Sequence, residues 1–116
     1  MPLFVLAGAF LLATAIAAPT RAGDSTDDYP TAARADYVFA CMAANGGTQQ
    51  ALQRCSCSVD VIASILPYAD YEKADTVLRM RRLGGGYLAE SFRTREADGF
   101  VDQLREAQAE ADVRCF

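Results

Sequence analysis

The sequence predicts an all-α fold, a small disulfide-stapled bundle of about four helices. Apolar residues recur at helical spacing in segments that glycine or proline separates. No β-branched run alternates at period two, so no strand is predicted. Four cysteines lie in a chain of only 116 residues. Because a core of this size is small, we expect the cysteines to fasten it as disulfides.

Residues 1–17 are predicted to be a signal peptide. Residues 3–16 are almost unbroken Leu, Phe, Val, Ala and Ile, which is shorter than the roughly 20 residues of a membrane span but fits a signal core. Small residues at Ala15 and Ala17 form an A-x-A cleavage site, and a second site allows cleavage as late as Ala22. The alternative is an uncleaved membrane anchor. One lysine against ten arginines indicates a GC-rich bacterial genome, so we expect a periplasmic or secreted protein, where disulfides persist.

A single helical domain is predicted over residues 30–116, after a disordered lead-in at 23–29 that is polar and acidic. The first helix begins at Pro30 or Thr31, because proline suits the first helical position. It ends at Asn45-Gly46-Gly47, where glycine supplies a left-handed cap. The second helix starts near Thr48, and Pro67 stops it. Its apolar face is Leu52, Cys55, Val59, Ile62 and Leu66.

Two further helices are predicted at about 69–83 and 94–115, with residues 87–93 left open between a loop and a short helical turn. The helix at 69–83 ends at the three glycines that follow Leu83. Its expected buried positions are Tyr71, Ala74, Leu78 and Met80. The last helix has the stripe Ala97, Phe100, Leu104, Ala107, Ala111 and Cys115.

The cysteine spacing favours two structural disulfides over zinc or thiol chemistry. A structural zinc site shows two close cysteine pairs, whereas only Cys55 and Cys57 are close here. A redox-active pair reads CxxC at a helix start, and this pair is CxC inside a helix. Two residues apart is about 200° around a helix axis, so the two side chains point to opposite sides and each reaches a different neighbour. The second helix is therefore expected to lie sandwiched at the centre of the bundle.

The favoured disulfide pairing is Cys41–Cys55 with Cys57–Cys115, over Cys41–Cys57 with Cys55–Cys115. The first two helices form an antiparallel hairpin about the Gly46-Gly47 turn. Cys41 lies about five residues before that turn, so Cys55 is offset from the ideal facing position by about 4.5 Å of rise and Cys57 by about 7.5 Å. The smaller offset suits the Cα separation of a disulfide better.

Composition excludes several functions. The absence of histidine excludes Ser-His and Cys-His catalysis and histidine metal sites. A net charge of −4 argues against nucleic-acid binding. The acids Asp70, Glu72 and Asp75 lack the DxDxDG spacing of a calcium loop and suit the start of a helix. We therefore expect no metal, no cofactor and no enzymatic activity.

Five of the eleven basic residues fall within seventeen positions. One interpretation is cation placement at a helix C-terminus, where positive charge is favoured. The functional interpretation is a docking patch for an acidic partner or an anionic ligand. The candidate partner-binding residues are Arg79, Arg81, Arg82, Arg93 and Arg95.

Three runs carry a family resemblance. They are Cys41-Met42-Ala43-Ala44-Asn45-Gly46-Gly47, Arg54-Cys55-Ser56-Cys57-Ser58-Val59-Asp60, and Leu66-Pro67-Tyr68 with Tyr71. The chain resembles small exported four-cysteine helical proteins that accompany quinoprotein (PQQ-dependent) alcohol dehydrogenase systems. The resemblance implies a periplasmic location and an accessory role near a dehydrogenase or its cytochrome. It carries no catalytic residues.

The sequence thus predicts a non-enzymatic periplasmic binding or accessory protein. Its partner would be another exported protein, with the quinoprotein dehydrogenase or its electron acceptor as the candidate from the resemblance. Neither nucleic acid nor, after signal cleavage, a membrane is expected to bind. The alternative is an acid- or stress-responsive periplasmic chaperone or inhibitor. With no histidine, its switch would depend on the 15 carboxylates and act below about pH 5.

Overall fold

The computed structural model of the chain describes residues 28–116. Within that range the protein is helical and has no strand, which confirms the predicted fold class. The predicted signal peptide and residues 23–27 of the predicted lead-in lie outside the described residues. The helices are α1 (Thr31–Asn45), α2 (Gln49–Ile65), α3 (Tyr68–Leu83), α4 (Tyr87–Ser91) and α5 (Arg95–Cys115).

Local signals in the sequence set the helix boundaries. The side chains of Thr48 and Thr94 each accept a hydrogen bond from the backbone N–H three residues later, at 3.1 Å, and so cap α2 and α5. Pro30 and Pro67 directly precede α1 and α3. Gly46 ends α1 with φ +94°, a conformation that a side chain disfavours. The four long helices therefore begin within a residue of their predicted starts.

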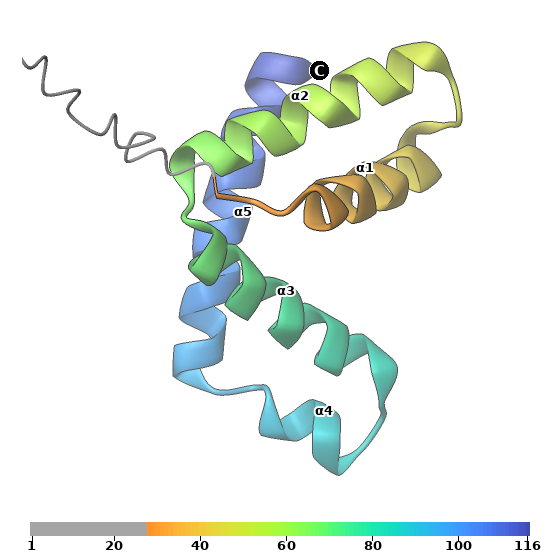
Figure 1. Cartoon of the computed structure of the whole chain (residues 1–116). Helices are drawn as coiled ribbons and strands as arrows, with labels where there is room; N and C mark the ends of the chain where they lie inside the picture. Colours follow the sequence, from red (N-terminus) through yellow and green to blue (C-terminus); the bar gives the residue numbers. More distant parts are fainter. Residues whose placement is uncertain (1–27) are drawn as a thin grey trace, which may run out of the picture.

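Helix α5 is the longest helix, and both α2 and α3 pack on it (Figure 1). Its C-terminal half lies against α2, and its N-terminal half lies against α3. Helix α1 packs on α2, and the short α4 packs on α3. Helix α2 is therefore sandwiched between α1 and α5, as predicted. Because α3 packs on α5 instead of α2, the two helices α2 and α5 share the centre.

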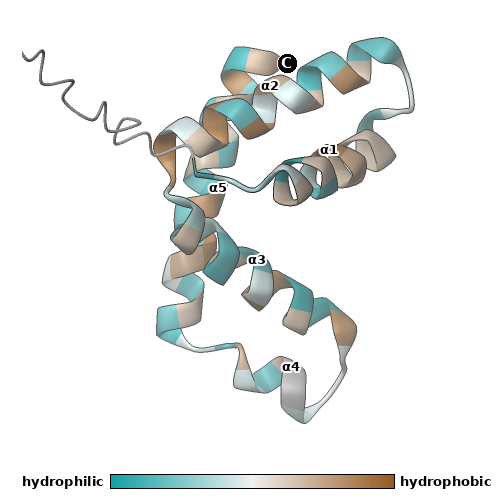
Figure 2. Cartoon of the chain, in the orientation of Figure 1, coloured by the Kyte–Doolittle hydropathy of each residue, from teal (hydrophilic) through white to brown (hydrophobic). Residues whose placement is uncertain are grey.

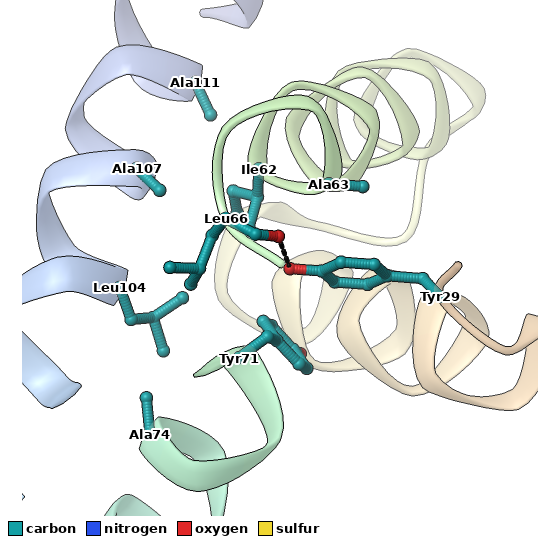
Figure 3. Packing of buried hydrophobic residues seen from close by; sticks show 9 residues of the cluster. All are labelled: Tyr29, Ile62, Ala63, Leu66, Tyr71, Ala74, Leu104, Ala107 and Ala111. Carbon is teal, nitrogen blue, oxygen red and sulfur yellow. Dashed lines mark hydrogen bonds between the residues drawn. The ribbon is translucent and has the colours of Figure 1, made fainter. Parts of the chain in front are cut away.

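The main core lies where α2, α3 and α5 meet (Figure 3). Ile62 of α2 is fully buried and faces alanines of α5, whose small side chains let the two helices approach closely. Burial of a side chain of this size stabilises the fold by about 1.5–3 kcal/mol. The cluster consists of Tyr29, Ile62, Ala63, Leu66, Tyr71, Ala74, Leu104, Ala107 and Ala111.

A second cluster joins α3 to the start of α5. Val77, Ala97 and Val101 are buried there, with Phe92 packed against them. The predicted stripes missed Val77 and Val101, because both lie beside the single helical face that the spacing selected. Conversely, Leu52 was predicted to be buried and is 37% exposed, since it falls near the turn that joins α1 to α2, where no third helix covers it.

Tyr29 corrects the predicted disordered lead-in, which ended at this residue. It is only 7% exposed, and its hydroxyl donates a hydrogen bond of 2.8 Å to the carbonyl oxygen of Leu66. Its ring contacts those of Tyr68 and Tyr71, with centroids 5.2 and 5.0 Å away. Burial raises the pKa of Tyr29 well above its usual range, and the neighbouring Tyr71 adds to this. The aromatic cluster overrides the polar composition of the preceding residues.

The favoured disulfide pairing is confirmed. Cys41–Cys55 ties α1 to α2, and Cys57–Cys115 ties α2 to the end of α5, with Cα separations of 5.8 and 5.7 Å. As expected, the two cysteines of the CxC motif leave α2 toward different neighbours. The bundle is thus stapled across both sides of its sandwiched helix.

Candidate functional site

Helix α1 differs from the other long helices because none of its residues is buried. The contacts that hold it include the disulfide from Cys41, an ion pair of 2.6 Å between Arg34 and Asp60 of α2, and an ion pair between Asp36 and Arg79 of α3. Its apolar side chains only partly cover the core. The helix therefore forms one wall of a cleft instead of a layer of the core.

The cleft lies between α1, α3 and α5 and has a volume of about 790 Å³, which is within the size range of small-molecule sites. Figure 1 shows that α1 and α3 extend to the same side of α5. Side chains of all three helices line the cleft. Its apolar floor includes Tyr71, Leu78 and Leu104. Tyr71 and Leu104 also belong to the main core, so the floor is rigidly supported.

Ser58 contributes a buried hydroxyl to the inner end of the cleft. The residue is 1% exposed, and its Oγ interacts with the Tyr37 hydroxyl without reaching ideal hydrogen-bond geometry with any described residue. A buried hydroxyl without a partner costs about 1–3 kcal/mol. Alanine, which is the residue at several neighbouring core positions, would avoid that cost.

Tyr37 and Asp112 approach the same end of the cleft. Burial raises the pKa of the Tyr37 hydroxyl, the interaction with Ser58 opposes that increase, and the negative charge of Asp112 adds to it. At neutral pH the phenol is therefore protonated. Asp112 is exposed and forms no ion pair with the described residues. Three oxygen-bearing side chains from α1, α2 and α5 thus converge on one place.

Arg79 spans the mouth of the cleft and joins two of its walls. Its guanidinium contacts Asp36 of α1 and bonds Asp75 of its own helix at 2.6 Å. These two hydrogen bonds raise the pKa of Arg79. Because two carboxylates already neutralise this arginine, it has little charge left for an anionic ligand.

The five predicted partner-binding arginines do not form one free surface. Besides Arg79, Arg81 bonds Asp98 at 2.6 Å and the carbonyl oxygen of Phe92 at 3.0 Å, so it fixes α5 and the end of α4. Arg93 pairs with Glu90 at 3.5 Å. Arg82 and Arg95 are exposed without an ion pair to any described residue. The prediction that the five bind a partner stays a prediction.

A loop tip between α3 and α4 exposes two large apolar side chains. We call residues 83–87 the α3–α4 tip. Leu83 is 80% exposed and Tyr87 is 85% exposed. The three glycines lie between them, and Gly86 has φ +77°. Figure 2 shows the hydrophobic end of α3 reaching this loop. The exposed Arg82 directly precedes the tip in the sequence.

The cysteines are not available for chemistry. All four described cysteines are in disulfides, and no group of three metal-binding side chains forms within residues 28–116. None of the described helices has the length and apolar character needed to cross a membrane. Two disulfides are typical of proteins from an oxidising compartment.

No family model, curated protein or solved structure matches this chain. The fold and site define its class directly: a disulfide-stapled helical bundle with an open cleft and an exposed apolar tip. Sequence reasoning missed the cleft, because its residues come from four helices. One signal was present, since Ser58 falls between Cys55 and Ile62 at helical spacing, on a side of α2 that is otherwise apolar.

Proposed function

We propose that this protein is a non-enzymatic binding or accessory protein of the periplasm that docks on another exported protein through the α3–α4 tip. The observation that supports it is the exposure of Leu83 and Tyr87, at 80% and 85%, beside unpaired arginine. Aromatic side chains and arginine are enriched where protein interfaces form. An apolar side chain so fully exposed gains free energy when a partner covers it.

The charge distribution favours an acidic partner. Residues 79–95 hold five arginines and one carboxylate, a net charge of +4, whereas the whole chain has −4. The remaining residues therefore carry −8. Complementary charge of this kind steers association and sets its salt dependence. The family resemblance points to a quinoprotein dehydrogenase or its cytochrome electron acceptor as that partner.

A matched pair of charge reversals tests the docking surface. Arg82→Glu changes an exposed, unpaired arginine beside the tip, and Arg105→Glu makes the same change at an exposed position of α5. Binding to the purified partner, first captured from periplasmic extract, is measured by surface plasmon resonance at two salt concentrations. We expect Arg82→Glu to weaken binding about tenfold or more and Arg105→Glu to change it little. Equal effects of the two variants would contradict the assignment of the tip.

A second candidate function, an acid-responsive chaperone, is supported by how α1 is attached. Two of the contacts that attach it are ion pairs that need the carboxylates of Asp36 and Asp60. Loss of these ion pairs in acid would release α1 from α2 and α3, uncovering the apolar floor of the cleft. Binding of a hydrophobic dye is followed from pH 7 to 2. A rise in fluorescence in the disulfide-bonded protein supports this function, and its absence down to pH 2 removes it.

A further inference from the structure

A second, smaller groove lies where the end of α2 and the start of α3 meet α5. We call it the α2–α5 groove. It has a volume of about 470 Å³, which is comparable with sites that enclose a small molecule. One of its apolar residues, Ile65, is 45% exposed. Side chains that line the groove include Ile65, Pro67, Asp70, Glu106 and Glu110.

Three carboxylates and no basic side chain line the α2–α5 groove. Glu106 is exposed and forms no ion pair with any described residue. Asp70 pairs with Lys73 at 3.6 Å, and Glu110 pairs with Arg114 at 2.7 Å. Because these four side chains are all partly exposed, such pairs contribute only about 0–1 kcal/mol and a second cation can replace the first. The groove therefore combines negative charge with apolar surface.

The α3–α4 tip has the opposite charge. Leu83 and Tyr87 are 80% and 85% exposed, and the adjoining Arg82 is exposed without an ion pair to any described residue. Residues 79–95 carry a net charge of +4, whereas the rest of the chain carries −8. The molecule thus has an apolar loop with positive charge and an apolar groove with negative charge, and patches of this kind attract each other.

The tip of one chain does not reach the groove of the same chain. Asp70 lies in the first turn of α3 and Leu83 ends it, so about 20 Å of helix separates them. Figure 1 shows α3 leading from its connection with α2 to the loop before α4. A second copy of the chain is therefore needed to bring a tip to this groove.

We propose that two copies of this chain associate by seating the α3–α4 tip of one copy in the α2–α5 groove of the other. Tyr87 covers Ile65, and Arg82 pairs with Glu106. The contact joins two different patches, so two copies can exchange tips about a twofold axis or further copies can add in a row. This inference rests on the docking role of the tip proposed above, and it makes a second copy compete with the exported partner.

Sedimentation velocity of the disulfide-bonded protein measures this self-association. The tip offers only two large apolar side chains, so the contact is weak and transient. We expect the weight-average mass to rise as the protein concentration increases to about 500 µM, and to fall when the salt concentration is raised to about 0.5 M. A mass that stays monomeric throughout, or an association that salt does not weaken, would overturn the proposal.

Charge reversals test each side of the contact. Arg82→Glu changes the tip and Glu106→Arg changes the groove, both at exposed positions. Glu72→Arg is the matched control, because this exposed residue lies about 200° around α3 from Asp70. We expect the first two variants to self-associate about tenfold more weakly and the control to change little. Parental self-association of Glu106→Arg, or an equal loss in Glu72→Arg, would overturn the groove.

Mixing Arg82→Glu with Glu106→Arg distinguishes a tip in a groove from a contact between two tips. The reversed tip of the first variant matches the reversed groove of the second, and their unchanged tip and groove also match. The equimolar mixture should therefore recover most of the parental association. A mixture that associates as weakly as its components would overturn the proposal.

Binding of the exported partner separates this inference from the proposed function. Glu106→Arg keeps its tip, so it should bind the partner at least as tightly as the parent does. If Glu106→Arg still self-associates while Arg82→Glu loses the partner, the groove is wrong and the proposed function stands. Parental partner binding by Arg82→Glu, together with lost self-association, would contradict the proposed function and support the contact between copies.

Discussion

Helices α1 and α5 are held in the bundle by different means. Helix α5 buries five side chains along its length, and it contacts both α2 and α3. Helix α1 buries none and is attached at separate points by a disulfide and two ion pairs. Each helix has one disulfide to α2, so the covalent tie alone does not distinguish them. The buried side chains along α5 make this helix part of the core. Helix α1 is attached by separate contacts instead, so it lies beside the core and lines the cleft.

This contrast explains why the cleft exists. A helix that packed on α3 with an apolar face would fill the space over Tyr71, Leu78 and Leu104. The α1 residues that line this space include Asp36, Ala40 and Asn45 instead. The ion pair from Asp36 to Arg79 joins α1 to α3 beside the cleft. Helix α1 adds only partly buried side chains such as Tyr37 to the main core, and the cleft lies between this helix and α3.

The largest expected effect comes from reducing both disulfides. They close loops with sequence separations of 14 and 58 residues, which corresponds to stabilisation by about 3 and about 4 kcal/mol. Because a domain has only about 5–15 kcal/mol of stability, reduction should unfold the protein or nearly so. Far-UV circular dichroism with and without reductant measures this, with alkylation to confirm four free thiols. Retention of the full helical signal and melting temperature by the fully reduced protein would contradict it.

The next prediction compares the stability lost by truncating a core side chain of α2 with that lost by truncating a side chain of α1. Ile62→Ala removes a fully buried side chain between α2 and α5 and should destabilise the protein by about 2–5 kcal/mol. Phe39→Ala truncates a larger side chain on α1 that is 78% exposed, so the free energy of unfolding should change by about 0.5 kcal/mol or less. Urea denaturation measures both. Comparable losses would show that α1 belongs to the core after all.

A smaller effect is expected at alkaline pH. Burial raises the pKa of Tyr71 to about 12, and nearby Asp75 and Tyr37 contribute. In the unfolded chain the phenol ionises near pH 10. Above about pH 10 the unfolded state therefore binds fewer protons, and stability falls as pH rises toward 12. Tyr71→Phe should make this decline shallower by at most about 1.4 kcal/mol per pH unit.

Tyr87→Phe is the control for the alkaline measurement, because this tyrosine is 85% exposed. Its variant should follow the parental stability curve from pH 9 to 12 in urea denaturation. A slope in Tyr71→Phe that equals the parental slope would contradict the buried titration.

Much of the fold could be predicted because its signals are local. Thr48 and Thr94 cap their helices, Pro67 and Gly46 punctuate the chain, and the helical period separates Cys55 from Cys57 by about 200°. The disulfide pairing followed from those boundaries. Each of these inferences needs only residues a few positions apart.

The remaining features depend on which helix packs against which. The burial of Tyr29 comes from tyrosines of α3, some 40 residues along the chain, and the exposure of Leu52 comes from a neighbour that is missing. Arg79 and Arg81 look alike in the sequence, yet one bridges α1 and the other fixes α5. The cleft depends on the same tertiary arrangement, because α3 packs on α5 and meets α1 through the ion pair of Arg79 with Asp36.

Native-state hydrogen exchange of the disulfide-bonded protein tests most directly the claim that α1 is held at points and not by burial. Amides in the middle of α1, around residues 35–40, should exchange through a local opening whose free energy is well below that of the amides of α2 around Ile62. Asp36→Asn should lower the protection of α1 further and leave α2 unchanged, since it removes only the ion pair to Arg79. Equal protection of α1 and α2, both opening with global unfolding, would contradict the account.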